Sequence, residues 1–572
     1  MENQKIARIF EEMADLLEIK GENPFRIRAY RKAALNIETL TEDVSTLIEE
    51  KRLNEIPGIG KDLAQKIEEI VKTGTLEQLE KLRKEIPSSL LELLSVPGLG
   101  PKTAKIIYDN LKIKSIEELE KVAKEHKLKG LPGIREKTEE NILKGIEILK
   151  AGRERRRIDQ AIAIAKSFIN YLKNIKGVEK ISEAGSVRRR KETIKDIDIL
   201  VVSSNPAYVM ERFISNPMVM EVISKGSTRS SIRTRDFMQV DLRVVEPQSF
   251  GSALAYFTGS KEHNIKLRDM AKGKGLKLNE YGIFNEITGE KLGGKEEEEI
   301  YRILGIQYIP PELREDRGEI EWAIEGRIPK LVDLKEIKGD FHIHSKWSDG
   351  GNSIEEIVQT AIRKGYEFIS ITDHSKSLGV AKGLNEEKLK AQREEIERLR
   401  DKYPQIKILH GIEVDIKSDG TLDFSDEILS NLDIVIGAIH SGFKQDRETI
   451  TKRIISAMEN PFVHIIAHPS GRLIGEREPY DVDMERILEY AKSTGTILEI
   501  NAFPQRLDLR DIYCKRAKEL GIMIAIGTDA HWTYQLDYME FGVWVARRGW
   551  LEKENVLNTY SWKEIKEFLK KK

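Results

Sequence analysis

The sequence has almost no cysteine. Cys514 is the single cysteine among 572 residues. One thiol can neither form an intrachain disulfide nor build a thiolate metal cluster, and its scarcity agrees with a reducing compartment. Any metal ion that the protein binds must therefore be held by histidine and carboxylate side chains.

Long apolar runs are missing as well. No stretch approaches the roughly 18 apolar residues that a membrane span needs, and the start, MENQKIARIF, lacks the basic-then-apolar layout of a signal peptide. Hydrophobic residues at 40% and charged residues at 33% describe a soluble globular protein. We therefore expect a cytoplasmic protein with no membrane partner, and the length indicates about three to five domains.

Net charge is also small, at −1, but it is unevenly distributed. Residues 1–150 carry about −1, residues 151–330 about +5 and residues 331–572 about −5, so the middle is the expected polyanion surface. Eight of the ten histidines follow residue 331. Between residues 310 and 340, charge and proline replace any clear periodic pattern, which indicates a boundary between two functional halves.

Two similar hairpins lie in the first 150 residues. IPGIGKDLAQKI (56–67) and VPGLGPKTAKII (96–107) both place Pro-Gly-apolar-Gly before a lysine-bearing helix. Such a turn aims backbone N–H groups and a helix N-terminus at an anion, which suits a DNA phosphate. An ordinary helix connection is the alternative for either copy alone. A third copy, LPGIREKTEENI, has Arg135 in place of the second glycine and is expected to be structural. The glycines predicted to approach DNA are Gly58, Gly60, Gly98 and Gly100.

Three carboxylates stand out in apolar strands of the middle region. In DIDILVV, Asp196 and Asp198 are two residues apart, so both side chains leave the same face of a strand. MQVDLRVV offers Asp241 on another strand. Three converging carboxylates can hold two magnesium ions about 3.5–4 Å apart for nucleotidyl transfer. A single Asp-x-Asp pair would more often be a solvated strand edge.

A turn upstream of these strands favours the catalytic interpretation. Gly185 and Ser186 form a small-residue turn, and Arg188 and Arg189 follow at once. Guanidinium groups bind phosphate oxygens in a bidentate manner, so this turn suits a triphosphate.

The turn, the aspartate strands and YFTGSKEHN (256–264) together resemble the family X DNA polymerases, over residues 1 to about 318. By composition alone, YFTGS is a strand end followed by a turn. The resemblance implies magnesium or manganese in the polymerase site, on Asp196, Asp198 and Asp241. It further implies nucleotide-binding roles for Gly185, Ser186 and Arg189 at the triphosphate, Tyr256 and Phe257 at the sugar, Gly259 in the adjoining turn and Asn264 at the base edge.

The same family can carry a 5′-deoxyribose phosphate lyase activity that uses a Schiff-base lysine. Lys66 stands at that position, but Asp62 and Arg26 replace a basic residue and a lysine of the family pattern. Fewer cationic neighbours depress the pKa of a lysine less. Contact with a phosphate is the alternative role of Lys66.

Most histidines after residue 331 follow apolar runs, as in ITDHS, GAIHSG, IIAHPSG and IGTDAHW. In a barrel of βα units all strands end at one face, so side chains far apart in sequence can share a pocket. Any one histidine alone would more often be an ordinary core or surface residue. His410 and His464 are interpreted as core residues or as residues that support the ligands from behind. The set exceeds what one ion needs and suits two or three manganese, zinc or iron ions. The predicted ligands are His342, His344, Asp349, His374, Glu413, His440, His468, Asp529 and His531.

These motifs resemble the PHP (polymerase and histidinol phosphatase) domain, a distorted seven-stranded βα barrel with a trinuclear metal centre. All nine ligand positions are filled, and the order of polymerase then PHP domain resembles the bacterial and archaeal PolX proteins. The resemblance implies a 3′–5′ exonuclease, usually manganese-dependent, with abasic-site endonuclease or 3′-phosphatase activity as further options. Asn501, Arg472 and Arg506 are candidate phosphate contacts, with ordinary surface residues as the alternative for all three.

The sequence thus predicts a monomeric repair enzyme that fills short gaps, acting on gapped or nicked duplex DNA with deoxyribonucleoside triphosphates. A small-molecule phosphatase of the PHP type, or a DNA end-binding scaffold with structural metals, are the alternatives. The fold class is multidomain, with all-α helix-hairpin-helix domains, an α+β polymerase beta-like palm with a thumb, and a distorted (β/α)7 barrel. The expected boundaries are 1–86 and 87–150 for the helical domains, 151–245 for the palm, 246–318 for the nucleotide-selecting subdomain, 319–335 for a linker and 336–572 for the barrel.

Overall fold

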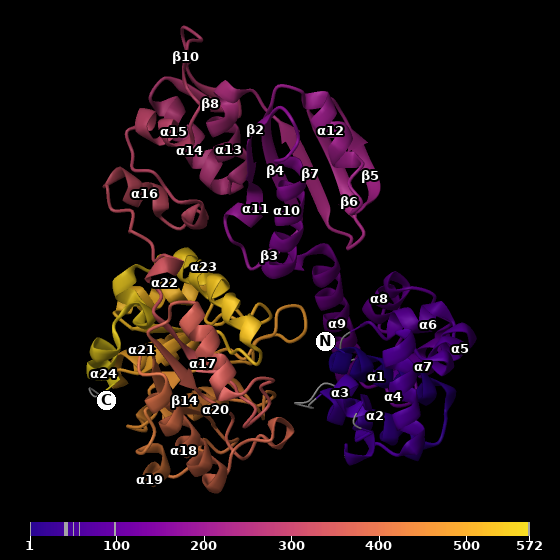
Figure 1. Cartoon of the computed structure of the whole chain (residues 1–572). Coiled ribbons are helices and arrows are strands. Elements are labelled where there is room, and N and C mark those ends of the chain that lie inside the picture. The colour runs from indigo at the N-terminus through magenta and orange to yellow at the C-terminus, as the bar shows by residue number, and fades with distance from the viewer. Residues whose placement is uncertain (1, 39–43, 50, 57, 97–98, 570–572) are drawn as a thin grey trace. The chain divides into compact units, whose positions relative to one another are not determined.

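The structure is a computed structural model that describes residues 2–38, 44–49, 51–56, 58–96 and 99–569. The chain forms two compact units (Figure 1). The first contains Met1–Arg153 with His344–Ile354 and Lys376–Asn385, and the second contains the rest. Among the described residues, no helix combines the length and the apolar composition that a membrane span requires.

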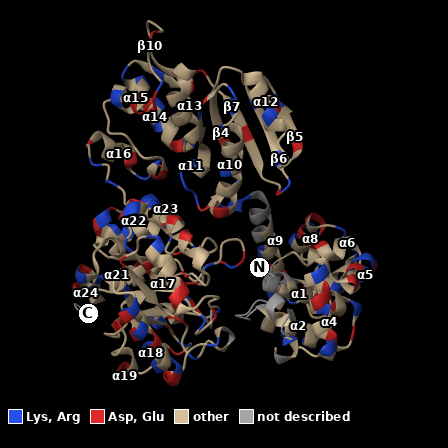
Figure 2. Ribbon diagram, viewed as in Figure 1, with Lys and Arg blue, Asp and Glu red and all other residues tan. Residues whose placement is uncertain are grey.

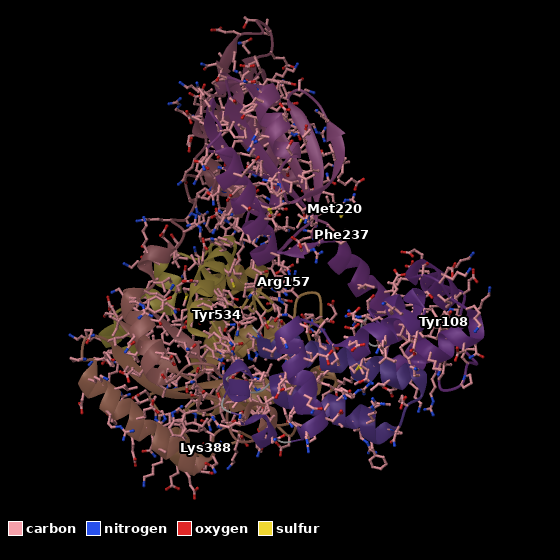
Figure 3. The ribbon with its side chains drawn as sticks, turned by 45° about the vertical axis from the view of Figure 1, so that its right-hand side comes forward. Tyr108, Arg157, Met220, Phe237, Lys388 and Tyr534 are labelled. Atoms are coloured by element: carbon pink, nitrogen blue, oxygen red, sulfur yellow. The ribbon has the colours of Figure 1, made fainter. Side chains whose placement is uncertain are left out.

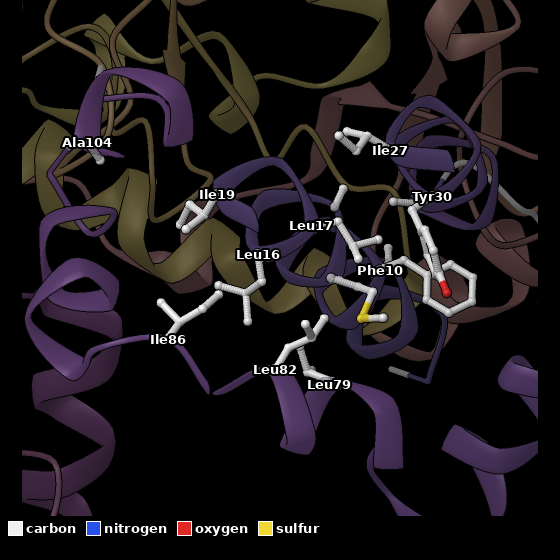
Figure 4. Packing of buried hydrophobic residues seen from close by; sticks show 14 of the residues in the cluster. Phe10, Leu16, Leu17, Ile19, Ile27, Tyr30, Leu79, Leu82, Ile86 and Ala104 are labelled. Atoms are coloured by element: carbon white, nitrogen blue, oxygen red, sulfur yellow. The ribbon is translucent and has the colours of Figure 1, made fainter. Parts of the chain in front are cut away.

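The N-terminal part of the first unit is helical, as expected. Its helix α1 buries Ile6, Phe10 and Leu17 at the three- and four-residue spacing of an amphipathic helix. Figure 4 shows Phe10 and Leu17 in a core with side chains of the neighbouring helices. The rings of Phe10 and Tyr30 meet edge to face at 5.4 Å. The helices are α1 (Glu2–Lys20), α2 (Pro24–Glu38), α3 (Val44–Glu49), α4 (Lys61–Thr73), α5 (Glu77–Glu85), α6 (Ser88–Leu93), α7 (Pro101–Leu111), α8 (Ile116–Lys124) and α9 (Glu136–Glu154).

The second unit begins with a five-stranded sheet of order β2-β4-β7-β6-β5. Strands β4 and β7 run parallel and the other neighbours are antiparallel. The edge strand β5 exposes Met220, and Phe237 is exposed in the turn after β6 (Figure 3). The elements are β1 (Arg156–Arg157), α10 (Ile158–Leu172), β2 (Val178–Glu183), α11 (Gly185–Arg188), β3 (Thr193–Ile194), β4 (Asp196–Ser203), α12 (Pro206–Ile214), β5 (Val219–Lys225), β6 (Arg229–Thr234) and β7 (Gln239–Val244).

A smaller helical and antiparallel part follows the sheet. Tyr256 and Phe257 lie on helix α13, so the strand end that composition suggested for YFTGS is wrong, and Gly259 ends the helix. The buried Arg314 guanidinium lies 2.6 Å from a carboxylate oxygen of Glu297. The elements are α13 (Phe250–Thr258), α14 (Lys261–Gly273), β8 (Leu276–Asn279), β9 (Gly282–Asn285), β10 (Lys291–Gly293) and α15 (Glu297–Leu304).

The segment predicted as a linker begins with a packed helix, α16 (Glu319–Ile324). The Glu319 carboxylate is buried, and its Oε1 lies 2.8 Å from Nδ1 of His263 on α14. Residues 319–324 therefore belong to the packed structure of the preceding part rather than to a free connector.

The last part is a parallel barrel. Its seven strands are hydrogen-bonded in chain order, and a bridge between Ile343 and Ala530 brings the last strand beside the first. Apart from the exposed Lys407 at the start of β13, every strand residue is buried, as expected of strands covered by helices. The strands are β11 (Gly339–Ile343), β12 (Phe368–Ile371), β13 (Lys407–Asp415), β14 (Ile434–Ala438), β15 (Ile465–Ile466), β16 (Ile497–Asn501) and β17 (Ile524–Gly527). The helices are α17 (Ile354–Arg363), α18 (Glu386–Lys402), α19 (Asp426–Leu429), α20 (Arg447–Glu459), α21 (Met484–Thr494), α22 (Asp511–Leu520), α23 (Met539–Arg548) and α24 (Trp562–Leu569).

The core of the first unit gives a stability test. We expect Phe10→Ala to destabilise α1 and α2 by about 3–5 kcal/mol, because it leaves a cavity beside Tyr30. Native-state hydrogen exchange of these helices measures the loss. Phe25→Ala is the matched control, since Phe25 is 76% exposed and its loss should cost less than about 0.5 kcal/mol. Equal effects of the two substitutions would contradict this packing.

Candidate active sites

The register of β4 and β7 brings the predicted catalytic carboxylates together. Asp198 pairs directly with Asp241 across these parallel strands, so their side chains leave the same face of the sheet, and Asp196 lies two residues earlier on that face. Burial raises the pKa of Asp198 to about 7, and the charges of Asp196 and Asp241 contribute to the increase. The mutual repulsion of three close carboxylates favours the binding of cations.

A cavity of about 630 Å³ lies beside these carboxylates, and both Asp196 and Asp198 line it. The walls carry cations and aromatic rings, as a triphosphate and its nucleoside require. Every nucleotide-binding candidate from the sequence lines this cavity, namely Gly185, Ser186, Arg189, Tyr256, Phe257, Gly259 and Asn264.

The glycine of the turn is explained by close packing. A Cβ atom on Gly185 would lie 2.3 Å from Oδ2 of Asp198, so a larger residue would displace this carboxylate. The backbone of Gly185 also has φ +60°, a region that favours glycine.

Arg189 is held in place at the cavity wall. Its Nε lies 3.0 Å from Oε1 of Glu315, and a second guanidinium nitrogen donates to the backbone oxygen of Thr258. The guanidinium is therefore oriented before any ligand arrives.

The far wall is formed around the end of α13. The rings of Tyr256 and Phe257 meet edge to face at 5.1 Å. The side-chain amide of Asn264 donates to the backbone oxygen of Tyr256 at 2.7 Å, and the Arg243 guanidinium lies 4.3 Å from the centre of the Phe257 ring.

Sequence reasoning missed further cations of this cavity. Arg155, Lys191, Lys195 and Arg268 also line it. Arg155 stands in the basic run RERRR (153–157), which was the one signal available before the structure.

The hairpin glycines are placed only in part. Gly58 has φ +82°, and Gly60 and Gly100 directly precede helices α4 and α7, as the motif predicts. Gly98 lies outside the described residues. In the third copy, Gly133 keeps a positive φ of 79° despite Arg135.

Lys66 forms close contacts with two neighbouring side chains in the first unit. Its Nζ lies 2.5 Å from Oδ2 of Asp62 and 5.3 Å from the centre of the Tyr30 ring. Burial alone would lower the pKa of Lys66, but hydrogen bonds to Asp62 and Tyr30 hold this pKa above its usual value. A protonated amine is not a nucleophile, which argues against the lyase role.

We expect little Schiff-base trapping at Lys66 at neutral pH. Because its pKa is raised above 10.5, the uncharged amine becomes common only at higher pH. Borohydride trapping on DNA with a 5′-deoxyribose phosphate measures this, and Asp62→Asn should increase the yield. Strong trapping at pH 7 that Lys66→Ala abolishes would show that the lysine is reactive after all.

In the barrel, four imidazoles surround the Glu413 carboxylate. The nearest distances to its oxygens are 2.8 Å from His374 Nδ1, 3.0 Å from His468 Nε2, 3.2 Å from His440 Nε2 and 3.5 Å from His342 Nε2. Burial alone would raise the pKa of Glu413, but His440, His374 and His342 hold it well below its usual range. His374, Glu413 and His440 offer ligand atoms within 4.8 Å of one another, close enough to share one ion.

The other predicted ligands lie at strand ends too. Asp529 Oδ1 is 3.7 Å from His342 Nε2, and His531 Nδ1 is 2.8 Å from the Asp529 backbone oxygen. His344 and Asp349 follow β11 and lie 3.8 Å apart, and both also occur in groups of potential ligands with atoms within 4.8 Å of one another.

A carboxylate that sequence reasoning missed orients one of these imidazoles. Glu499 on β16 is buried, and its Oε1 lies 2.6 Å from Nδ1 of His342. Its Oε2 accepts a hydrogen bond from the backbone N–H of His468. This arrangement directs Nε2 of His342 towards Glu413, as carboxylates behind metal-binding histidines do. The sequence signal was a lone glutamate in the apolar strand TILEIN.

Of the three residues expected to contact phosphate, two lie beside the metal-ligand cluster and one does not. Arg506 Nε and the Asn501 amide lie 3.2 and 3.1 Å from Oδ2 of Asp529, at the edge of the cluster. Arg472 is wrong as a phosphate contact, because its buried guanidinium is bound to both carboxylate oxygens of Glu192 and to backbone carbonyls.

Two histidines of the barrel region, His410 and His464, were left out of the ligand set and have other surroundings. Burial lowers the pKa of His410 to about 4. His464 Nδ1 accepts a hydrogen bond from the backbone N–H of Val435.

The donor chemistry of both sites fits divalent cations. Carboxylates alone on the palm sheet suit magnesium or manganese, whereas mixed imidazole and carboxylate donors in the barrel suit the transition metals. The fold and these sites define a chain in which a polymerase-type palm and thumb are followed by a metal-dependent phosphoesterase barrel.

Comparisons with protein families agree with this division. Residues 1–76 match a helix-hairpin-helix domain, residues 90–147 a SAM-like helix-hairpin-helix tandem, residues 253–315 the DNA polymerase beta thumb and residues 340–503 the PHP domain.

Known proteins match the chain in two ways. The DNA polymerase/3′-5′ exonuclease PolX of Bacillus subtilis (strain 168) is 42% identical over 573 residues, which is 100% of both chains. Proteins named "probable phosphatase" from Thermoanaerobacter sp. (strain X514) and Caldanaerobacter subterraneus are 36% and 33% identical over 245 residues, 41% of this chain and 94% and 91% of their own. The chain belongs to the PolX family of DNA polymerases with a PHP domain.

The orienting role of Glu499 can be tested directly. We expect Glu499→Gln to weaken Mn²⁺ binding by about 10–100-fold, because the amide no longer fixes His342 through a charged hydrogen bond. Isothermal titration of metal-free protein measures the affinity. Glu519→Gln, on the exposed face of α22, is the matched control and should change nothing. Unchanged affinity in Glu499→Gln would contradict the assignment.

Proposed function

We propose that this chain is a DNA-directed DNA polymerase that fills short gaps in duplex DNA and carries a 3′–5′ exonuclease in its barrel. The observation that carries the proposal is that one chain holds both donor sets, the aspartates of the palm sheet and the imidazole cluster around Glu413. Full-length similarity to a protein named for both activities supports it.

In the palm, Asp196, Asp198 and Asp241 would hold magnesium or manganese. When bound, such ions activate the attacking oxygen and neutralise charge on the phosphoryl group. The chain itself supplies Arg189 and Ser186 to orient the triphosphate. Tyr256 and Phe257 form the wall against the sugar, with Gly259 in the adjoining turn and Asn264 at the base edge, where they exclude water from the nucleotide.

In the barrel, the proposed ligands of two or three manganese, zinc or iron ions are the nine residues that the sequence predicts. Glu413 would hold such an ion together with His374 and His440, since the three offer ligand atoms within 4.8 Å of one another. Arg506, beside Asp529, is suited to bind the phosphate of a DNA 3′ end. Abasic-site endonuclease and 3′-phosphatase activities stay predictions.

The hairpins of the first unit would contact the duplex through backbone N–H groups at the starts of α4 and α7. We propose gapped or nicked DNA and deoxyribonucleoside triphosphates as substrates and a monomeric state. We also propose the division into six segments expected from the sequence, with residues 319–324 packed as helix α16.

The phosphatase alternative has one observation in its favour, the similarity to proteins named "probable phosphatase". That similarity covers only 41% of the chain. A phosphatase function would therefore not explain the hairpins, the palm or the nucleotide cavity. Faster release of phosphate from histidinol phosphate than of nucleotides from DNA would favour this alternative. A DNA end-binding scaffold would instead bind DNA without extending or degrading it in any divalent metal.

The division of labour can be tested on a one-nucleotide gapped duplex with deoxyribonucleoside triphosphates, in Mg²⁺ and then in Mn²⁺. We expect Asp196→Ala with Asp198→Ala to abolish extension and to spare exonuclease activity, because these carboxylates serve only the palm site. His342→Ala with His344→Ala should do the reverse.

Gel analysis of extended and shortened primers reads both activities in one reaction. Loss of both activities in either double variant, with an unchanged melting profile, would contradict the separation of the two sites.

A further inference from the structure

The segment that follows the nucleotide-binding turn is held by two arginines from the barrel. Arg548, at the end of α23, donates from its guanidinium to the backbone oxygen of Arg189 at 2.7 Å. Arg472 contacts both carboxylate oxygens of Glu192 at 2.7 and 3.1 Å. Arginines of the barrel therefore bind the palm segment 189–192 at both of its ends.

Arg548 also reaches the carboxylate that orients the Arg189 side chain. Its guanidinium lies 3.0 Å from Oε1 of Glu315, the same oxygen that the Nε of Arg189 contacts at 3.0 Å. A further nitrogen of Arg548 lies 2.7 Å from Oδ2 of Asp511, at the start of α22. The chain of charges runs from Arg189 through Glu315 and Arg548 to Asp511. Asp511 and Arg548 lie on α22 and α23, whose mixed charges are visible in Figure 2.

The network is shielded from water. The side chains of Arg548, Glu315, Asp511 and Arg189 are 5%, 11%, 12% and 13% exposed. Buried charges tolerate little displacement, because breaking one pair leaves the partner desolvated and uncompensated. Arg189 and Glu315 both line the nucleotide cavity, so Arg548 lies directly behind the cavity wall.

Glu315 brings a negative charge to a cavity meant for a triphosphate. With Arg548 present, two guanidinium groups neutralise this carboxylate, and Arg189 keeps capacity to bind phosphate oxygens. Without Arg548, Glu315 would rely on Arg189 and on Lys191, whose Nζ lies 3.6 Å away. Both cations line the cavity and would then be drawn from the incoming phosphates.

We propose that Arg548 of the barrel is a positioning residue for nucleotide binding by the polymerase. It fixes the main chain of Arg189 and neutralises Glu315, so that the Arg189 side chain is available to the triphosphate. The inference rests on the proposed polymerase function and adds that a residue of the barrel supports nucleotide binding in the palm.

The test uses the full chain and steady-state insertion into a one-nucleotide gap. We expect Arg548→Met to raise the KM for the deoxyribonucleoside triphosphate roughly tenfold, as the loss of charged hydrogen bonds does, with kcat changed less than about threefold. Exonuclease activity on single-stranded DNA should be unchanged. Arg516→Met, an exposed arginine on α22, is the matched control and should leave the KM unaltered.

A double-variant cycle separates positioning from general damage. Arg548 contacts both Glu315 and the main chain of Arg189, and Glu315 acts on the same Arg189, so Arg548→Met combined with Glu315→Gln should raise the KM no more than the worse single variant does. A KM increase in the double variant equal to the product of the two single-variant increases would overturn the proposed chain of contacts. Arg548→Lys keeps one charge and should give an intermediate KM.

The outcomes distinguish this inference from the proposed function. Absence of any insertion by the unaltered protein would refute the polymerase assignment itself. Normal insertion with an unchanged KM in Arg548→Met would refute only the role of Arg548. Loss of exonuclease activity in both Arg548→Met and Arg548→Lys would show a structural role for this arginine and would also overturn the inference.

Discussion

Ionisable side chains forced together at the ends of parallel strands are the constraint on which both sites depend. In the palm, the register of β4 and β7 holds Asp198 opposite Asp241, and burial with mutual repulsion raises the pKa of Asp198 to about 7. Backbone hydrogen bonds of the sheet keep these carboxylates close despite their repulsion. Bound cations reduce that repulsion, so the pairing of β4 with β7 gives the site an affinity for metal ions.

The barrel meets the same constraint in another way. Glu413 is as deeply buried as any acid of the palm, but imidazoles from four other strand ends surround it and keep it ionised. Glu499 then fixes the ring of His342 from behind. The mixed donor set selects a different class of ion from the all-carboxylate set of the palm, which lets one chain carry two chemistries.

Much of this organisation could be predicted from the sequence, because it depends on local patterns. The spacing of Asp196 and Asp198 in a β-branched run shows that they share a face, and repeated strand-end histidines indicate a barrel face. Two features resisted prediction. Glu499 looks like any glutamate until its strand is placed beside His342, and Arg472 looks like an exposed phosphate ligand although Glu192, 280 residues away in sequence, binds it. Composition also misled at Tyr256 and Phe257, since aromatic residues favour strands but here end a helix.

The sequence by itself determined which side chains have the chemistry to hold metal, and that the aspartates of β4 and the strand-end histidines belong to strands, because these properties follow from residue chemistry and from the period of 2 residues. Only the tertiary structure decided which of them meet and what supports them. Contacts such as Arg548 with the backbone of Arg189 join residues 359 positions apart, and such a contact depends on how whole elements pack rather than on any local pattern.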